Sequence, residues 1–318
     1  MVATKFQGPG EKHPPMVNAS PWQGRAELSF ALDAAGTTGF QGGSTAPLRL
    51  QRSFCRGDGR CELPLLHTAG GLVGGDELWV EAKLAAGSRA LITTVAAQKV
   101  YGSRGRSRQQ PQGRWASQQL HFQLEAEADL EWLPQETVVF SGGLLEQHCR
   151  VQLAADAHWL GAEVVRLGRT ASGESLGCGQ WRSHLEIQRQ GQWELVDRLE
   201  LGGEALTAPH GMDGQPVFGS LAWACPGAVP AELLELCRAD SQGLPGSLAC
   251  GILERGLIAR YRGPSSQAAR FWFTRIWARI RQHRGLAAAE LPRVWPFQEA
   301  PLWGQAQDRC TVQPERSA

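Results

Sequence analysis

The first candidates for chemistry in this sequence are acidic residues in glycine- or proline-containing loops. Asp76 directly follows the segment Gly-Gly-Leu-Val-Gly-Gly at residues 70–75. Glycines let a backbone approach a ligand closely, as in a phosphate-binding loop. Such a loop also needs a Lys-Ser or Lys-Thr pair and the start of a helix after the glycines, and the sequence offers neither. The simpler interpretation is a tight turn that the Asp76 side chain caps.

Two further acids, Glu131 and Glu136, flank Pro134. Because proline cannot donate a hydrogen bond to a β-ladder, residues 130–137 are predicted to form a corner between two strands. Paired carboxylates at such a corner could carry out acid–base chemistry or hold a divalent ion. The alternative is that both acids are solvated residues of a turn.

A third loop, residues 167–175, carries Arg169 and Glu174 between glycines. An ion pair across the loop would account for both residues. Cys178 follows between two glycines, and a nucleophilic thiol there would need a general base. No neighbouring histidine completes a recognisable motif, so a hydrolase that uses Cys178 or a carboxylate pair stays an alternative. A fully buried thiol would exclude it.

The β-prone run at residues 91–101 is mostly uncharged but contains Lys99. A half-buried lysine would need an anion, because an unpaired buried charge is very costly. The alternative is an edge lysine whose ammonium group reaches solvent. The sequence leaves both possibilities open.

Fixed metal-ligand spacings of the familiar kinds are not found in the sequence. It contains no Cys-x-x-Cys, His-Glu-x-x-His or Cys-x-x-His motif, and Cys55, Cys61 and His67 are too loosely spaced to predict a zinc site. A permanently bound metal is therefore not expected. Weak, oxygen-rich sites for an ion in transit would leave no such pattern.

Short segments separated by frequent turns must position these residues. Thirty-eight glycines, many of them in Gly-Gly pairs, mark turns at short intervals. The segments between them are of strand length and often alternate apolar with polar residues, which indicates a mainly β protein. The predicted strands are residues 26–32, 48–54, 78–84, 90–95, 119–124, 137–140, 151–154, 184–190 and 193–201.

Helical periodicity is found mainly near the C-terminus. Residues 230–239 begin with a proline suited to a first helical turn, and residues 265–284 carry apolar side chains at helical spacing before Gly285. One β domain over residues 21–305 with flexible tails at 1–20 and 306–318 is the simplest organisation.

Composition limits the classes of partner. The 32 basic and 31 acidic residues leave a net charge of +1, so there is no overall attraction to nucleic acid or anionic lipid. Neither a secretory signal nor an apolar run long enough to span a membrane is found, and the eight scattered cysteines are expected to be free thiols in the cytoplasm. The twelve tryptophans leave a β-rich carbohydrate-binding module as an alternative, which rows of exposed tryptophans would support.

Six short motifs follow one another along the chain: Pro47-Leu48-Arg49, Gly74-Gly75-Asp76, Thr93-Thr94 with Lys99-Val100-Tyr101, Leu133-Pro134-Gln135-Glu136, Gly168-Arg169 with Gly173-Glu174, and Pro292-Arg293-Val294-Trp295. Each is weak alone, but in this order they resemble the urease accessory protein family UreD, called UreH in some organisms, over residues 22–295. Gly102 stands where an arginine is common in the family, and Cys55 replaces a more usual aromatic residue before an insertion-like turn at residues 56–60.

The resemblance implies a single domain of helical β-sheet architecture with a few helices, mostly near the C-terminus. It also implies a non-enzymatic chaperone for metallocentre assembly, with nickel in transit and no permanently bound cofactor. Such a scaffold binds apo-urease and UreF, and through UreF it recruits the GTPase UreG, while the metallochaperone UreE supplies nickel indirectly.

The resemblance further implies an internal path along which nickel moves, lined by carbonyls and a few carboxylates that bind weakly. Asp76, Glu136 and Glu174 are the candidates, because each lies in a motif of the family. The C-terminal helix is expected to pack on the protein's own sheet or to help dock UreF, in which case Arg275 and Arg279 would meet carboxylates of that partner.

Overall fold

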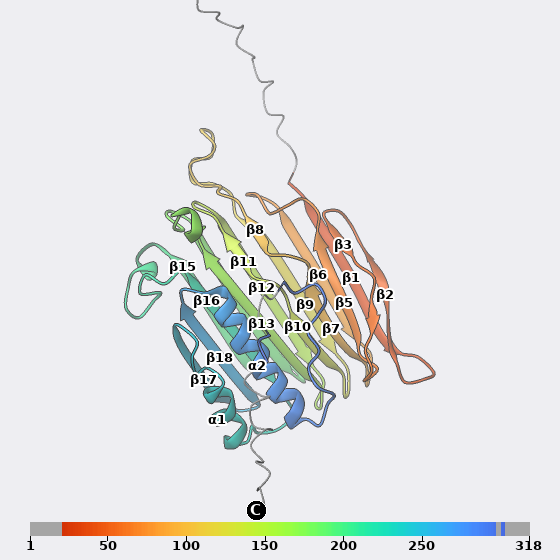
Figure 1. Ribbon diagram of the computed structural model, residues 1–318. Helices are drawn as coiled ribbons and strands as arrows, with labels where there is room; N and C mark the ends of the chain where they lie inside the picture. Colours follow the sequence, from red (N-terminus) through yellow and green to blue (C-terminus); the bar gives the residue numbers. More distant parts are fainter. Residues whose placement is uncertain (1–20, 297–299, 303–318) are drawn as a thin grey trace, which may run out of the picture.

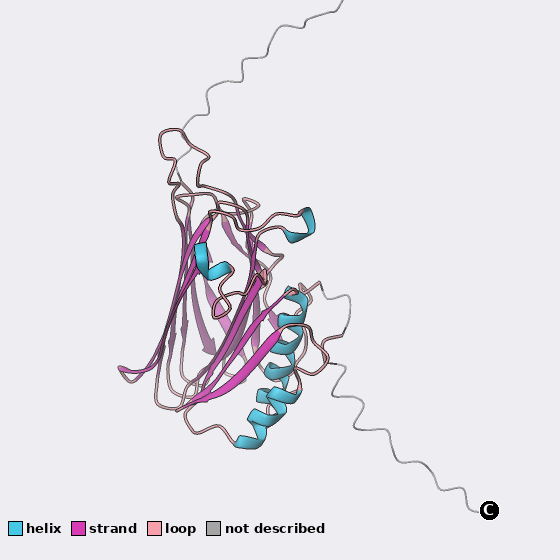
Figure 2. Ribbon diagram, turned by 90° about the vertical axis from the view of Figure 1, so that its left-hand side faces the viewer, coloured by secondary structure: helices cyan, strands magenta, loops and turns pink. Residues whose placement is uncertain are grey.

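The chain passes back and forth between two β-sheets that lie face to face in a computed structural model (Figures 1 and 2). Residues 21–296 and 300–302 are described, and the predicted tails at residues 1–20 and 306–318 lie outside them. The predicted class, mainly β with a few helices toward the C-terminus, is confirmed.

The first sheet has seven strands, and its five inner neighbours β1, β6, β9, β12 and β14 run parallel to one another. β2 and β15 close its two edges as antiparallel strands. In spatial order the strands are β15 (Gln192–Gly202), β14 (Gln180–Arg189), β12 (Leu144–Leu153), β9 (Ala116–Leu124), β6 (Glu77–Leu84), β1 (Gln23–Leu32) and β2 (Thr38–Ser44).

The second sheet has eleven strands. Its main path is β17 (Ser247–Leu253), β18 (Gly256–Gly263), β16 (Val217–Ala224), β13 (His158–Leu167), β10 (Asp129–Leu133), β7 (Arg89–Thr94), β5 (Cys61–His67) and β3 (Leu48–Leu50). Three short strands pair beside this path: β4 (Phe54–Cys55), β8 (Gln98–Val100) and β11 (Thr137–Val139).

From β6 to β14 the chain alternates between the two sheets, and this explains why neighbouring strands of one sheet run parallel. β6, β9, β12 and β14 belong to the first sheet, while β7, β10 and β13 fall between them in the chain and belong to the second. Parallel neighbours need a crossover connection, and here a strand of the opposite sheet supplies it where many folds use a helix. This is the helical β-sheet architecture that the resemblance implies.

The prediction of one continuous strand at residues 48–54 is wrong. β3 and β4 both pair with β5, but the residues between them leave the ladder, and the backbone N–H of Gln51 donates to the carbonyl of Pro64. Pro64 has no N–H to donate in return, which interrupts regular pairing at this point.

The core lies between the sheets, and buried residues alternate with exposed ones along the strands as expected. In β1, Ala26, Leu28 and Phe30 are buried while their neighbours are exposed, so one face of the first sheet meets the core and the other meets solvent. β13 and β16 were not predicted as strands, because none of their residues is exposed and the alternation of polar with apolar residues is weak in both.

Two α-helices, α1 (Ala231–Ala239) and α2 (Ser266–His283), are found in the described part of the chain and confirm the two predicted helices. Ser265 caps α2 by accepting a hydrogen bond from the backbone of Ala268. α2 packs on β13, β16 and β18, with Trp272 and Trp277 fully buried, so its apolar face does cover the protein's own sheet (Figures 1 and 2). Neither helix, nor any other described one, is both long and apolar enough to cross a membrane.

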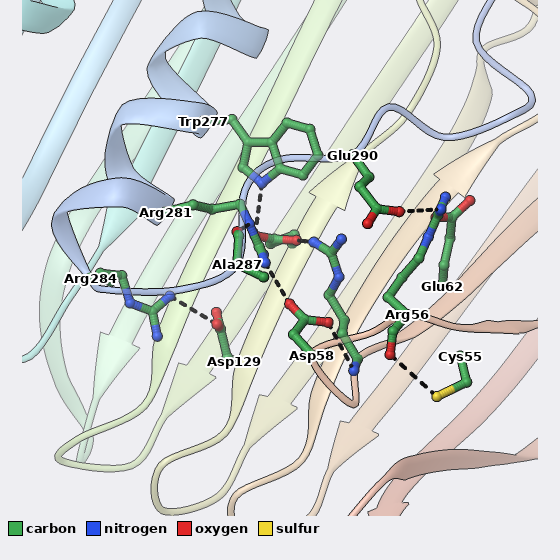
Figure 3. Close-up of polar contacts among 12 residues, drawn as sticks. Cys55, Arg56, Asp58, Glu62, Asp129, Trp277, Arg281, Arg284, Ala287 and Glu290 are labelled. Carbon is green, nitrogen blue, oxygen red and sulfur yellow. Dashed lines mark hydrogen bonds and ion pairs between the residues drawn. The ribbon is translucent and has the colours of Figure 1, made fainter.

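A buried network of charges fastens α2 to the second sheet (Figure 3). One oxygen of Glu131 in β10 accepts from both Trp277 and Arg281 of α2, each over 2.7 Å, and the other oxygen pairs with Arg60. Asp58 binds the far side of the Arg281 guanidinium. The insertion-like turn at residues 56–60 therefore supplies partners for α2, a role that its sequence did not suggest.

Residues 21–296 also include two 3-10 helices, η1 (Thr170–Ser172) and η2 (Gly203–Leu206).

Candidate functional site

Segments that the sequence marked as separate motifs meet in one hydrogen-bonded belt. Backbone hydrogen bonds join the loop at residues 70–76 to β8, since Leu72 donates to the carbonyl of Lys99 over 2.8 Å. β8 pairs with β11, and β11 pairs with β13. Gly168, directly after β13, donates to the carbonyl of Val139 over 2.7 Å. The belt thus links the Gly-Gly-Asp, Lys-Val-Tyr, Leu-Pro-Gln-Glu and Gly-Arg segments side by side.

Close packing explains the glycine at residue 71. Its φ of 153° lies in a region that side chains rarely adopt, and a Cβ atom there would lie 2.7 Å from the Tyr101 ring and 2.9 Å from the Lys99 carbonyl oxygen. The Lys99 side chain is exposed, so the solvent-reaching alternative for this lysine is confirmed.

Asp76 is buried and holds the N-terminal end of the fold. Its two carboxylate oxygens accept hydrogen bonds from the backbone N–H groups of Trp22 and Val73, both over 2.9 Å. The capped turn predicted from the sequence is therefore present.

Glu174 forms the ion pair across its loop that the sequence suggested. Its carboxylate pairs with Arg169 and also accepts from the backbone N–H of Ser141 over 2.8 Å. The Arg169 hydrogen bonds, and next the Ser141 N–H, hold the pKa of the Glu174 carboxyl below its usual range. Cys178 lies exposed in the following turn, where its carbonyl accepts from Arg104, so burial does not exclude this thiol.

Glu136 pairs with Arg270 of α2 over 3.0 Å. The neighbouring Gln135 is buried and donates to the carbonyl of Val294, while Trp295 donates to the hydroxyl of Thr93 over 2.9 Å. The C-terminal Pro-Arg-x-Trp segment is thereby attached to the strand corner. Asp76, Glu136 and Glu174 thus have separate protein partners, and the structure does not join them in one cluster.

A cavity of about 80 Å³ lies between the two sheets beside this belt. Its walls come from strands of both sheets and mix polar with apolar side chains. The polar and acidic wall residues include Gln98, Gln118, Gln147, Glu163, Ser183 and Asp197.

Glu163 is an acidic group in this wall whose pKa is raised by burial. Burial raises its pKa to about 7, against the opposing effects of a hydrogen bond from Ser183 and the charge of Arg260. Ser183 Oγ donates to the Glu163 carboxylate over 2.8 Å, and Asp197 nearby pairs with Arg260. The interior of the sandwich therefore holds a carboxyl group that exchanges its proton near neutral pH.

A second cavity, of about 400 Å³, adjoins the first. The two share Thr94, Gln98, Gln118 and Trp132 as wall residues. The second cavity also borders His67 and the Gly70-Gly71 turn. Burial lowers the pKa of His67, and among the described residues its Nε2 atom has no hydrogen-bond partner. A neutral imidazole therefore lies in the wall of this larger space.

Sequence reasoning missed Glu163 and His67. A single acid inside an apolar run, as in Ala-Glu-Val-Val at residues 162–165, was the available signal for Glu163. It was not used because β13 was not predicted. His67 was considered only as a partner for Cys55 and Cys61, and neither cysteine borders the second cavity.

Comparison with known families decides the identity. Residues 23–296 match the family described as UreD urease accessory protein. The chain belongs to the UreD family.

Similar proteins support this assignment along most of the chain. A urease accessory protein UreD of Synechococcus sp. strain RCC307 is 60% identical over 286 residues, covering 89% of this chain and 92% of that protein. UreD of Synechococcus sp. strain CC9605 is 57% identical over 295 residues, covering 90% and 94%. UreD of Prochlorococcus marinus strain MIT 9313 is 57% identical over 298 residues, covering 89% and 93%.

The two arginines considered for docking a partner of UreD have partners within the chain. Arg279 binds both carboxylate oxygens of Asp240, at the end of α1, over 2.8 and 2.9 Å. Arg275 donates to the carbonyls of Asp240 and Pro301, both over 2.8 Å. These side chains fasten α2 to α1 and to the C-terminal segment.

Proposed function

We propose that this chain is a non-enzymatic scaffold for urease maturation that acts in the cytoplasm and lets nickel pass through its interior toward apo-urease. It binds apo-urease and UreF, and through UreF it recruits the GTPase UreG, while the metallochaperone UreE supplies nickel indirectly. Membership in the UreD family supports the urease role. The turn at residues 70–76 is stabilised by its own aspartate and lacks the features of a phosphate-binding loop, which supports a GTPase in a separate protein.

The observation that carries this proposal is the pair of adjoining cavities with Glu163 in the wall. An ion in transit needs ligands that bind weakly enough to release it. A carboxyl with a pKa of about 7 suits this need, because nickel must compete with a proton for the same oxygens. Glutamine amides and hydroxyl groups add neutral oxygens to the route.

The three acids predicted to line the nickel path have different positions in this proposal: Asp76, Glu136 and Glu174. Asp76 acts electrostatically on His67, which borders the larger cavity, and Glu136 follows Gln135 of the smaller cavity wall. Glu174 is bound by Arg169 at the rim of the belt. The proposal therefore gives Asp76 and Glu136 supporting positions beside the route and leaves Glu174 the most peripheral of the three.

The alternative carbohydrate-binding function receives little support. Trp132, Trp159, Trp181, Trp223, Trp272 and Trp277 are buried. Trp22 and Trp193 are about half exposed but lie before β1 and in β15, at opposite sides of the first sheet. Rows of exposed aromatic rings, which a sugar-binding face would need, are not formed by the described tryptophans.

The proposed function can be tested by producing urease with and without this chain in cells that contain UreE, UreF and UreG. Urease purified from both cultures is assayed for nickel content and for bound accessory proteins. We expect UreF to co-purify with urease only when the chain is present, together with a large rise in nickel content. Equal nickel content in both cultures would reject the proposal.

A further inference from the structure

The outer face of the first sheet carries a group of side chains that the interior route does not use. β12 and β14 are neighbouring parallel strands, and their register places His148 directly beside His184. Gln147 and Ser183, one residue earlier in each strand, line the interior cavity. Because side chains alternate along a strand, the two histidines point away from the cavity. In Figure 2 the helices cover the other sheet and leave this face uncovered.

Glu146 completes a compact group with these two histidines. One possible ligand atom from each of the three residues lies within 4.8 Å of the others. Glu146 Oε2 is 3.7 Å from His148 Nε2, and the two imidazole rings have centroids 4.3 Å apart with an interplanar angle of 55°. All three side chains are partly exposed, so an ion could reach them from solvent.

The neighbouring charges leave the Glu146 carboxylate available. Arg150 and Arg198 both pair with Glu186, and Arg182 pairs with Glu200. Among the described residues, Glu146 makes an ion pair with His148 alone. The arginines of this face are thus neutralised by other acids, while one carboxylate remains beside two imidazoles.

We propose that Glu146, His148 and His184 form a surface site for a divalent first-row transition ion. Two imidazole nitrogens and one carboxylate oxygen are ligands that suit Ni²⁺, Zn²⁺ and Cu²⁺ better than Mg²⁺ or Ca²⁺. Metal–ligand distances of about 2.0–2.2 Å would bring ligand atoms at tetrahedral or octahedral angles to about 3.0–3.4 Å from one another, so these partly exposed side chains need to move by up to about 2 Å. Water fills the remaining positions, and the bound ion can exchange.

This site is separate from the interior route. The backbones of β12 and β14 lie between it and the cavity that contains Glu163. The inference therefore does not rest on the proposed function, and either can fail while the other holds.

The test is a titration of the purified full-length chain with NiCl₂ and, separately, ZnCl₂, followed by calorimetry and by equilibrium dialysis with metal analysis. The double variant His148→Ala/His184→Ala is compared with two controls. His121→Ala removes a histidine from the next strand of the same face, where its ring packs against Trp79 at an interplanar angle of 31°. Glu163→Gln removes one carboxylate from the wall of the interior cavity.

We expect the double variant to bind one ion fewer per chain than the wild type, and His121→Ala to keep the wild-type number. Glu163→Gln should keep the surface ion whether or not it alters other binding. Circular dichroism monitors folding, and if the alanine pair unfolds, His148→Gln/His184→Gln replaces it. The same number of bound ions in the wild type and in a folded double variant would overturn the proposal.

Discussion

Arg281 of α2 donates to Glu131 of β10 over 2.7 Å, with 2% and 4% of the two side chains exposed. Arg60 and Asp58 extend the pair on either side, so charges from a hairpin, a core strand and the C-terminal helix neutralise one another away from water (Figure 3). Each charge in such a network depends on its partners, since a buried charge left alone is strongly unfavourable.

We expect Arg281→Met to lower the free energy of unfolding by about 3–5 kcal/mol, because it leaves Glu131 and Asp58 without their shared partner. Arg238→Met is the matched control. Arg238 pairs with Glu235 on the exposed side of α1 and also donates to the carbonyl of Cys250, and such a surface pair contributes about 0–1 kcal/mol. Urea denaturation measures both variants. If Arg281→Met costs no more than Arg238→Met, the network does not stabilise the fold.

Asp76→Ala should destabilise the protein by about 1–3 kcal/mol, because it leaves the N–H groups of Trp22 and Val73 without their acceptor. Thermal and urea unfolding can measure this loss. Glu77→Ala, at the exposed next residue, serves as the control and should change stability little. An Asp76→Ala protein as stable as the Glu77→Ala protein would show that these two hydrogen bonds do not stabilise the fold.

Whether α2 also docks UreF can be tested separately from its role in the fold by exchanging charges. Arg279→Glu alone should destabilise the chain because it opposes Asp240, whereas Arg279→Glu combined with Asp240→Arg should recover most of that stability. UreF binding by the double variant is then measured by pull-down at low and moderate salt. Weakened binding with recovered stability would support direct contact, and unchanged binding would make this ion pair purely structural.

Local features of the fold were predictable from the sequence. The helices at residues 230–239 and 265–284 lie within a residue of the observed α1 and α2, since proline, serine and glycine mark their ends. The pairing of the strands was not predictable, because alternation tells which side chains face a core and not which strand lies beside which. Strands buried on both faces, such as β16, also lose the alternation itself.

In the candidate site, too, local contacts could be predicted from the sequence and long-range contacts could not. The Arg169–Glu174 pair joins residues five positions apart and could be inferred from one loop. The Glu136–Arg270 pair joins residues 134 positions apart and depends on where α2 packs. Glu163 faces its cavity because two sheets enclose it, and this arrangement exists only after the whole chain has folded.

The raised pKa of Glu163 predicts a pH dependence of stability. Between the ordinary value of 4.5 and the folded value of about 7, the folded chain holds a proton that the unfolded chain releases. The contribution of Glu163 to stability therefore falls as pH rises through this range. Glu163→Gln should match the wild type near pH 4.5 and exceed it by about 1–3 kcal/mol at pH 8. Urea unfolding at both pH values measures the difference in free energy of unfolding between the variant and the wild type. If that difference is the same at both pH values, the pKa of Glu163 is not raised in the folded chain.

The most direct test of the central claim is the nickel content of urease matured with the Glu163→Gln chain. The variant should fold and co-purify with urease and UreF, because Glu163 lies inside the sandwich and contacts no outer surface required for assembly in this account. We predict that urease from these cells contains much less nickel than urease matured with the wild type or with Glu77→Gln when nickel is limiting. Full nickel content with the Glu163→Gln chain would contradict an interior route past this carboxylate.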